Sequence, residues 1–220
     1  MNCSDLNRFF EFDIRPFTTK VVFESGSHIL HEGSAPDYLY YLVEGRAKLF
    51  LSHENGRVSL ISFLDAPCFI GEIELLGAQA AARGVTAITR CECYAIRIDR
   101  CKDQLLKDTT FLRYLCLFLS KKSIDNTNNF SRNLCYSLET RLANFILTTA
   151  HNGIYREKHT EVAEYLGVTY RHLLYVIAKF VKSGILEKSE QGYCQKKHLV
   201  GVSKLFYRST HVFCQSQLQL

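Results

Sequence analysis

The spacing of hydrophobic residues predicts strands in the first half of the chain. Between residues 21 and 98, short apolar or alternating runs are separated by turn residues every several positions. That spacing is typical of an all-β sandwich or barrel. Asn55-Gly56 lies between the runs at 46–52 and 58–64. It predicts a β-hairpin, because a two-residue primed turn requires a positive φ that these two residues tolerate.

After Asp99 the apolar residues recur at a helical period, and glycine is absent from 99 to 152. We expect one long helix from about Thr110 to Arg132, at roughly 1.5 Å per residue. A helix of that length beside a small β domain usually buries its apolar stripe against another chain. The pattern therefore predicts a homodimer. The predicted dimer contacts are Leu112, Leu115, Leu119, Ile124 and Phe130.

The last third of the chain predicts three helices and a β-hairpin. Ser137, Thr160 and Thr169 are the expected N-caps of helices at 138–150, 161–166 and 170–182. Two short helices separated by a tight break at 167–169 make a helix-turn-helix. The runs at 185–189 and 193–197 are expected to form a β wing.

Charge separates the same two parts of the chain. Residues 1–136 carry 16 Lys and Arg against 16 Asp and Glu, whereas residues 137–220 carry 11 against 6. A neutral part joined to a basic part is typical of a ligand module joined to a module that binds a polyanion, most commonly DNA. We expect three parts: an effector domain at 1–108, a dimerisation helix and hinge at 109–136, and a DNA-binding domain at 137–220.

Composition excludes several classes of protein. The 220 residues are 47% hydrophobic and 22% charged, which is typical of a folded chain. The N-terminus lacks the basic and apolar regions of a secretion signal, and no apolar run is long enough to span a bilayer. These features predict a cytoplasmic protein. The motifs of P-loop, zinc-protease and serine-hydrolase sites are absent, so we expect neither catalytic residues nor an enzyme.

The third predicted helix of the C-terminal part carries the candidate chemistry. In a helix-turn-helix the second helix enters the major groove with its N-terminal residues toward the bases. Arg171 is the expected base contact, since a guanidinium can bridge guanine O6 and N7, while Thr169 and Lys179 suit phosphates. The alternative is that this helix only packs in a helical bundle, with Leu173, Leu174, Ile177 and Phe180 as its core face. The predicted DNA contacts are Thr160, Thr169, Tyr170, Arg171, His172, Tyr175 and Lys179.

This order of parts resembles the Crp/Fnr superfamily of bacterial transcription regulators. Residues 69–75 (Phe-Ile-Gly-Glu-Ile-Glu-Leu), followed by Arg-Gly-Val at 83–85, resemble its phosphate-binding cassette, and 161–169 resemble its helix-turn-helix. Residues 66–75 and 164–176 look like the YeiL type. The resemblance implies an α+β fold with an N-terminal cyclic-nucleotide-binding-like β-roll (double-stranded jelly roll), a long dimerisation helix and a C-terminal winged helix-turn-helix. It also implies a homodimeric regulator with double-stranded DNA and RNA polymerase as partners.

The resemblance further implies cyclic AMP or another cyclic nucleotide as effector. In cyclic-AMP binders the cassette's Gly and Glu hold the ribose, an Arg-Ser pair takes the phosphate, and the long helix meets the base. Here Gly84 replaces that Ser. The effector residues carried over are Gly71, Glu72, Ile73, Arg83, Gly84, Thr127 and Asn128. The open alternative is a roll kept for dimer geometry, with Glu72 and Arg83 as a structural ion pair.

The nine cysteines leave a redox or iron–sulfur alternative open. Relatives that sense oxygen hold a cluster mostly near the N-terminus, where this chain offers Cys3. Cys91 and Cys93 share a strand face about 6.6 Å apart, which suits metal ligation better than a disulfide. Isolated cysteines more often behave as small buried hydrophobes. We therefore expect no metal, and we expect His28 and His31 on opposite strand faces, unable to share one.

Overall fold

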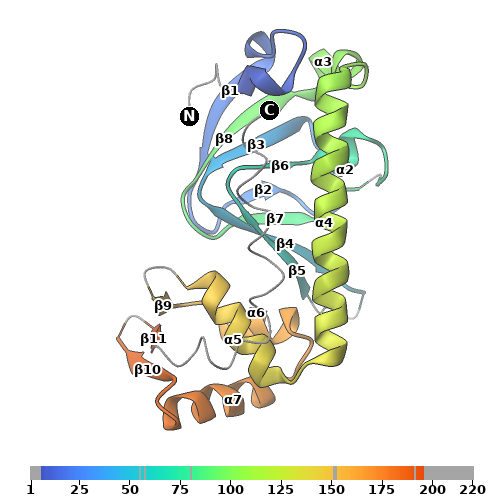
Figure 1. The fold of residues 1–220 in the computed structure, drawn as a ribbon. Coiled ribbons are helices and arrows are strands. Elements are labelled where there is room, and N and C mark those ends of the chain that lie inside the picture. Colours follow the sequence, from blue (N-terminus) through green and yellow to red (C-terminus); the bar gives the residue numbers. More distant parts are fainter. Residues whose placement is uncertain are drawn as a thin grey trace. The chain divides into compact units, whose positions relative to one another are not determined.

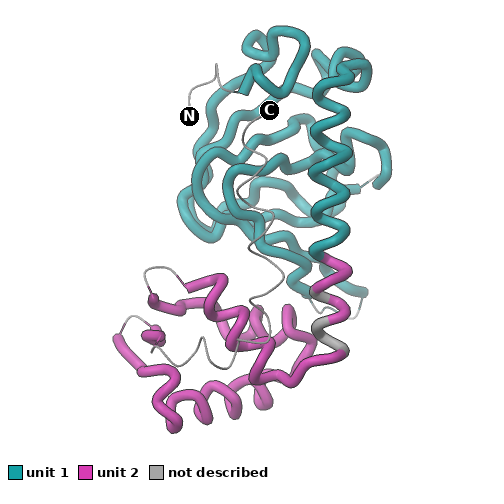
Figure 2. Tube along the Cα trace, viewed as in Figure 1, with its two compact units in different colours: residues 1–125 teal, residues 126–220 magenta. Residues whose placement is uncertain are grey.

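The structure, a computed structural model, describes residues 6–195 except residues 55, 57, 80, 151, 152 and 191, and the side chains at 129 and 132–134. The chain divides into two compact units, residues 1–125 and 126–220 (Figure 2). The division falls inside the long helix α4 (Thr109–Cys135), which the sequence predicts almost in full. No helix in the described part of the chain combines the length and apolar character needed to cross a bilayer.

In the described part of the first unit, eight strands form two antiparallel sheets (Figure 1). Their orders are β1-β8-β3-β6 and β2-β7-β4-β5. The strands are β1 (Thr18–Phe23), β2 (His28–Leu30), β3 (Tyr38–Glu44), β4 (Arg46–Ser52), β5 (Val58–Asp65), β6 (Cys68–Ile70), β7 (Gly84–Ala87) and β8 (Cys91–Arg97). This β-roll confirms the predicted fold class.

In the sheet β1-β8-β3-β6, strand β3 packs apolar side chains on both faces. On β3, Leu39 and Tyr41 pack in one apolar cluster with Phe111 of α4, while Leu42 packs in a second cluster with residues of the other sheet. Successive side chains of a strand point to opposite faces, so β3 supplies both clusters. A strand buried on both faces needs an almost continuous apolar run, which residues 39–43 provide.

The hairpin predicted around Asn55-Gly56 is confirmed by the pairing of β4 with β5. Their register runs from Arg46 opposite Asp65 to Ser52 opposite Val58. Gly56 has φ +76°, and its N–H donates to the carbonyl of His53 at 2.9 Å. Asn55 lies outside the described residues.

The expected separation of His28 and His31 is wrong. Their ring centroids lie 5.0 Å apart. Strand β2 ends at Leu30, and its pairing with β7 shifts register between His28 and Leu30, so strict alternation does not extend to His31.

Short helices lie around the roll, and the long α4 begins beside its N-terminal segment. Asp108 caps α4: its Oδ1 accepts from the N–H of Phe111 at 2.8 Å, and its Oδ2 accepts from the N–H of Glu11 at 2.7 Å. The N-terminal segment is thereby attached to the start of α4. The short helices are the 3-10 turns Asn7–Phe9 and Arg15–Phe17, α2 (Glu72–Leu75) and α3 (Ile98–Leu105).

The second unit contains the predicted helix-turn-helix and wing. The helices are α5 (Leu138–Thr149), α6 (His159–Tyr165) and α7 (Tyr170–Lys182), and the strands are β9 (Ile154–Tyr155), β10 (Leu186–Ser189) and β11 (Gly192–Gln195). Strand β11 pairs with β10 on one side and β9 on the other, so the wing has a strand that the sequence analysis missed. The predicted wing residues Lys196 and Lys197 lie outside the described residues.

Two of the three predicted N-caps are confirmed. The Ser137 hydroxyl oxygen accepts from the N–H of Thr140, and that of Thr169 accepts from the N–H of His172 at 3.2 Å. Thr160 is wrong as a cap: α6 begins at His159 with Lys158 in the capping position, which places Thr160 inside the first turn.

Candidate nucleic-acid interface and ligand pocket

Helix α7 is held firmly by the turn before it. Gly167 adopts φ +64°, and the N–H of Val168 donates to the carbonyl of Ala163 at 2.9 Å, which ends α6 in a Schellman-type turn. The Arg141 guanidinium of α5 donates to the carbonyl of Leu166 in the same turn. The start of α7 is therefore fixed by backbone and side-chain hydrogen bonds.

The two faces of α7 differ sharply in burial. Leu173, Val176, Ile177 and Phe180 are buried in the core of the second unit. The opposite face contains Arg171, Tyr175 and Lys182, all exposed, with Tyr175 67% accessible. Spacings of four and seven residues place these three side chains on one stripe of the helix. Lys182 is not among the predicted DNA contacts, although its spacing from Arg171 places it on the same stripe.

The other predicted DNA contacts are exposed but not equivalent. Tyr170 and His172 lie in the first turn of α7, whereas Thr160 lies in α6. Thr169 is also exposed and uses its hydroxyl oxygen as the helix cap.

Lys179 is engaged within the unit. Its Nζ lies 3.1 Å from Glu139 Oε1 of α5, so α5 neutralises part of its charge. The pKa of Glu139 lies below its usual value, first because its own backbone N–H stabilises the carboxylate and then because of Lys179.

The predicted dimer residues occupy different faces of α4. Leu115 is 1% exposed and belongs to the roll's own core, so it is wrong as a contact with a second chain. Leu112 and Leu119 are half-buried, whereas Ile124 and Phe130 are 60% and 67% exposed. Leu117, which the sequence analysis left out, is 61% exposed and precedes Ile124 by seven residues.

Four of the five predicted effector residues of the first unit line a small pocket, and Gly84 is not among the lining residues. Gly71, with φ +94°, precedes α2 and brings Glu72 into the roll, where that residue is 2% exposed. The pocket encloses about 30 Å³. Its lining residues are Leu30, Leu49, Leu64, Phe69, Ile70, Gly71, Glu72, Ile73, Glu74, Gln79, Arg83, Val85 and Lys122.

The partner of Glu72 is Lys122 of α4. Lys122 Nζ donates to Glu72 Oε1 at 2.9 Å and lies 5.5 Å from the centre of the Phe118 ring. The possible Glu72–Arg83 pair is therefore not the ion pair that forms here, and Arg83 lines the pocket half-buried. Thr127 and Asn128 are exposed and belong to the second unit, so their role toward a ligand stays a prediction.

Gly84 is buried beneath an aromatic ring. It pairs with Phe50 across β7 and β4, and a Cβ added at Gly84 would lie 2.1 Å from Phe50 Cζ. No side chain fits at position 84 unless Phe50 moves. The Gly at position 84, where cyclic-AMP binders carry Ser, is thus accompanied by a Phe50 ring in the space that the Ser side chain would need.

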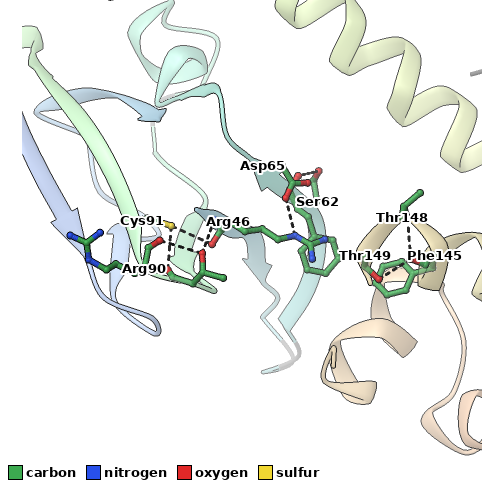
Figure 3. A network of polar contacts seen from close by, with 10 residues as sticks. Arg46, Ser62, Asp65, Arg90, Cys91, Phe145, Thr148 and Thr149 are labelled. Atoms are coloured by element: carbon green, nitrogen blue, oxygen red, sulfur yellow. Dashed lines mark hydrogen bonds and ion pairs between the residues drawn. The ribbon is translucent and has the colours of Figure 1, made fainter. Parts of the chain in front are cut away.

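The four cysteines on the described strands and α3 of the roll, Cys68, Cys91, Cys93 and Cys101, are buried. The Cys91 thiol donates to the carbonyls of Arg46 and Thr89 at 3.3 and 3.4 Å (Figure 3). Burial raises the pKa of both Cys68 and Cys93 to about 12, which disfavours the thiolate that metals bind. Among the described residues, no group of three or more His, Cys, Asp or Glu could hold a metal ion.

Comparisons with known proteins identify the family. Residues 20–108 match the family model "Cyclic nucleotide-binding domain". The chain is 47% identical over 193 residues to the regulatory protein YeiL of Escherichia coli O157:H7, covering 87% of this chain and 88% of YeiL. This chain belongs to the Crp/Fnr family of transcriptional regulators. The resemblance to the YeiL type read from residues 66–75 and 164–176 is confirmed.

More distant members of the family share the fold. The chain is 26% identical to the cAMP-activated global transcriptional regulator CRP of Escherichia coli O6:H1 over 130 residues, 58% of this chain and 61% of CRP. A solved CRP/FNR-family regulator from Thermus thermophilus is 21% identical with a TM-score of 0.71, covering 84% of this chain and 98% of that one. Another from Eubacterium rectale is 16% identical with a TM-score of 0.74, covering 87% and 92%.

A cyclic nucleotide, which the family implies, does not fit the pocket as these residues form it. Small-molecule pockets enclose roughly 300 Å³ or more. The volume here is about 30 Å³, and the Glu72 carboxylate is already paired with Lys122. Of the cassette, Arg83 keeps a side chain suited to phosphate.

Proposed function

We propose that this Crp/Fnr-family regulator acts as a homodimer that binds double-stranded DNA through α7. The observation that carries the proposal is the exposed stripe of Arg171, Tyr175 and Lys182 on a helix whose other face is buried and whose start is fixed by a cap. A recognition helix needs such rigid support, because base contacts depend on precise side-chain placement.

Different side chains on α7 are proposed for different parts of the DNA. Arg171, in the first turn, is our candidate for a bidentate contact with guanine, and Tyr170 and His172 flank it. Lys182 lies three turns later and suits a phosphate, as does the excess positive charge of residues 137–220. Lys179 reaches a phosphate only in competition with Glu139.

The dimer contact is proposed along the outer face of α4. Leu117 and Ile124 are large, exposed and seven residues apart, which places them on one side of the helix. Two-fold symmetry would then present two α7 helices to half-sites about one turn of DNA apart. RNA polymerase is the second partner we propose, since a transcriptional regulator acts on that enzyme. The named relatives are regulators, and we propose no catalytic activity.

Selection from random double-stranded DNA by the purified full-length protein, at one fixed salt concentration, tests this function. We expect enrichment of a two-fold-symmetric sequence, and loss of its enrichment for Arg171→Ala. The matched control is Glu164→Gln on α6, an exposed position outside the proposed contacts. Failure to enrich any sequence would contradict the proposal.

A further inference from the structure

A lysine of the protein itself occupies the polar centre of the roll's pocket. Glu72 is buried, with its side chain 3% exposed, and Lys122 reaches it from fifty residues along the chain. A buried carboxylate requires a cation or several hydrogen-bond donors. Here the Lys122 ammonium supplies the charge, while its own side chain stays 24% exposed at the edge of the pocket.

The remaining space is too small for a nucleotide. A volume of about 30 Å³ holds roughly one or two water molecules. Leu30, Leu49, Leu64 and Val85 line the pocket as apolar walls from the sheet β2-β7-β4-β5. A ligand of nucleotide size would have to displace the side chains of these apolar walls as well as the Lys122 ammonium.

Phe50 occupies the space that a side chain at position 84 would need. Because a Cβ at Gly84 would approach the Phe50 ring to 2.1 Å, Gly84 and Phe50 form a matched pair. The ion pair thus occupies the polar centre of the pocket, while Phe50 excludes a hydroxyl side chain at position 84.

We propose that Lys122 is a built-in substitute for the effector: its ammonium holds Glu72, ties α2 to α4, and makes the protein independent of cyclic nucleotides. In this arrangement the connection between the cassette and the long helix is present without any ligand. The inference goes beyond the proposed DNA binding, and its test does not require that DNA binding be correct.

Calorimetric titration of the full-length protein with cyclic AMP is the first test. We expect no saturable binding up to about 1 mM, a concentration at which even weak sites fill. DNA affinity, where measurable, should be the same with and without the nucleotide. Saturable binding to the wild-type protein, or a nucleotide-dependent change in DNA affinity, would overturn the proposal.

The ion pair itself is tested by acylating the lysines and following Lys121 and Lys122 by mass spectrometry. Lys121, the exposed neighbour on α4, is the internal control. Lys122 should be acylated at about one tenth of the rate of Lys121 or slower, because the ion pair must open first. Glu72→Gln should bring the rate at Lys122 toward that at Lys121. Equal rates in the wild-type protein overturn the proposal, and this comparison requires no variant to fold.

Discussion

At the scale of single residues, the Glu72–Lys122 pair should be important for the stability of the roll. Lys122→Met keeps the apolar stem and removes the ammonium, which leaves the Glu72 carboxylate buried without its cation. Removing one partner of a buried pair typically costs 3–5 kcal/mol, and we expect about 3 kcal/mol because Lys122 is partly exposed. Calorimetric unfolding, which can resolve the two units, measures the loss.

Two variants serve as controls for that loss. Lys121→Met changes the exposed neighbour and should alter stability by less than about 0.5 kcal/mol. Replacing both Glu72 and Lys122 by Met should recover much of the loss, since apolar replacement of a buried ion pair is often neutral. An equal effect of Lys121→Met and Lys122→Met would contradict the assignment.

Arg171 and Lys182 lie on one stripe of α7 but should differ in what they recognise. Arg171→Ala should lose about 1–3 kcal/mol on the selected site and relax specificity at one base pair. Lys182→Ala should weaken binding to all sequences alike and reduce the slope of log K against log salt by about 1. Fluorescence anisotropy on matched and mismatched duplexes distinguishes them. A uniform loss for Arg171→Ala would reassign that residue to phosphate.

At the scale of elements, sequence predicts those parts whose ends carry a local signal. Ser137 and Thr169 cap their helices with their own side chains, so the starts of α5 and α7 could be predicted. Thr160 has the same chemistry, but α6 begins before it. The strand β9, of two residues, is too short to show any period and gains its pairing from β11.

Contacts between distant residues explain what the sequence could not predict. Apolar residues occur on both faces of α4, and periodicity does not tell which face meets the roll. The sequence analysis therefore predicted the buried Leu115 as a dimer contact and left out the exposed Leu117. Glu72 and Arg83, predicted from the cassette sequence as effector residues, both line the pocket. Nothing in the spacing indicates that Lys122 reaches Glu72 or that Phe50 covers Gly84, because packing alone brings these residues together.

The connection between α5 and α7 should depend on pH through Glu139. Its pKa is lowered in the folded protein, so the carboxylate stabilises the unit above the unfolded pKa, and this contribution is lost as pH falls through the folded pKa. Glu139→Gln should therefore cost less than about 1 kcal/mol near neutral pH, since Lys179 is exposed. The difference from wild type should vanish in acid. Thermal unfolding of both proteins across this pH range measures it.

Glu139→Gln, which should lower stability, should strengthen DNA binding. Without Glu139, Lys179 is free to meet a phosphate, which should steepen the salt dependence by about one contact. Glu164→Gln, also an exposed acidic position of the second unit, is the control for the general change in charge. Equal salt slopes for Glu139→Gln and Glu164→Gln would show that the ion pair does not restrain Lys179.

At the scale of the whole molecule, α4 packs on the roll and, in the proposed homodimer, also contacts a second copy of the chain. Its inner face is used by Phe111 and Leu115 in the roll's core. Its outer face leaves Leu117 and Ile124 61% and 60% exposed. Large aliphatic residues aligned on one helix face are expected to be covered by a partner, and a two-fold axis along α4 would bring each residue close to its copy.

Substituting Leu117 and Ile124 together by Asp should therefore convert the dimer to monomers. Symmetry places each new carboxylate twice in the interface, where like charges repel at a cost of several kcal/mol. A monomer holds a single α7, so its affinity for a two-fold-symmetric site should fall by roughly 10² to 10⁴. Val22→Asp on β1 starts from a residue 40% exposed outside α4 and should leave the dimer intact. Sedimentation velocity separates the cases: a Leu117→Asp, Ile124→Asp protein that still sediments as a dimer would place the interface elsewhere.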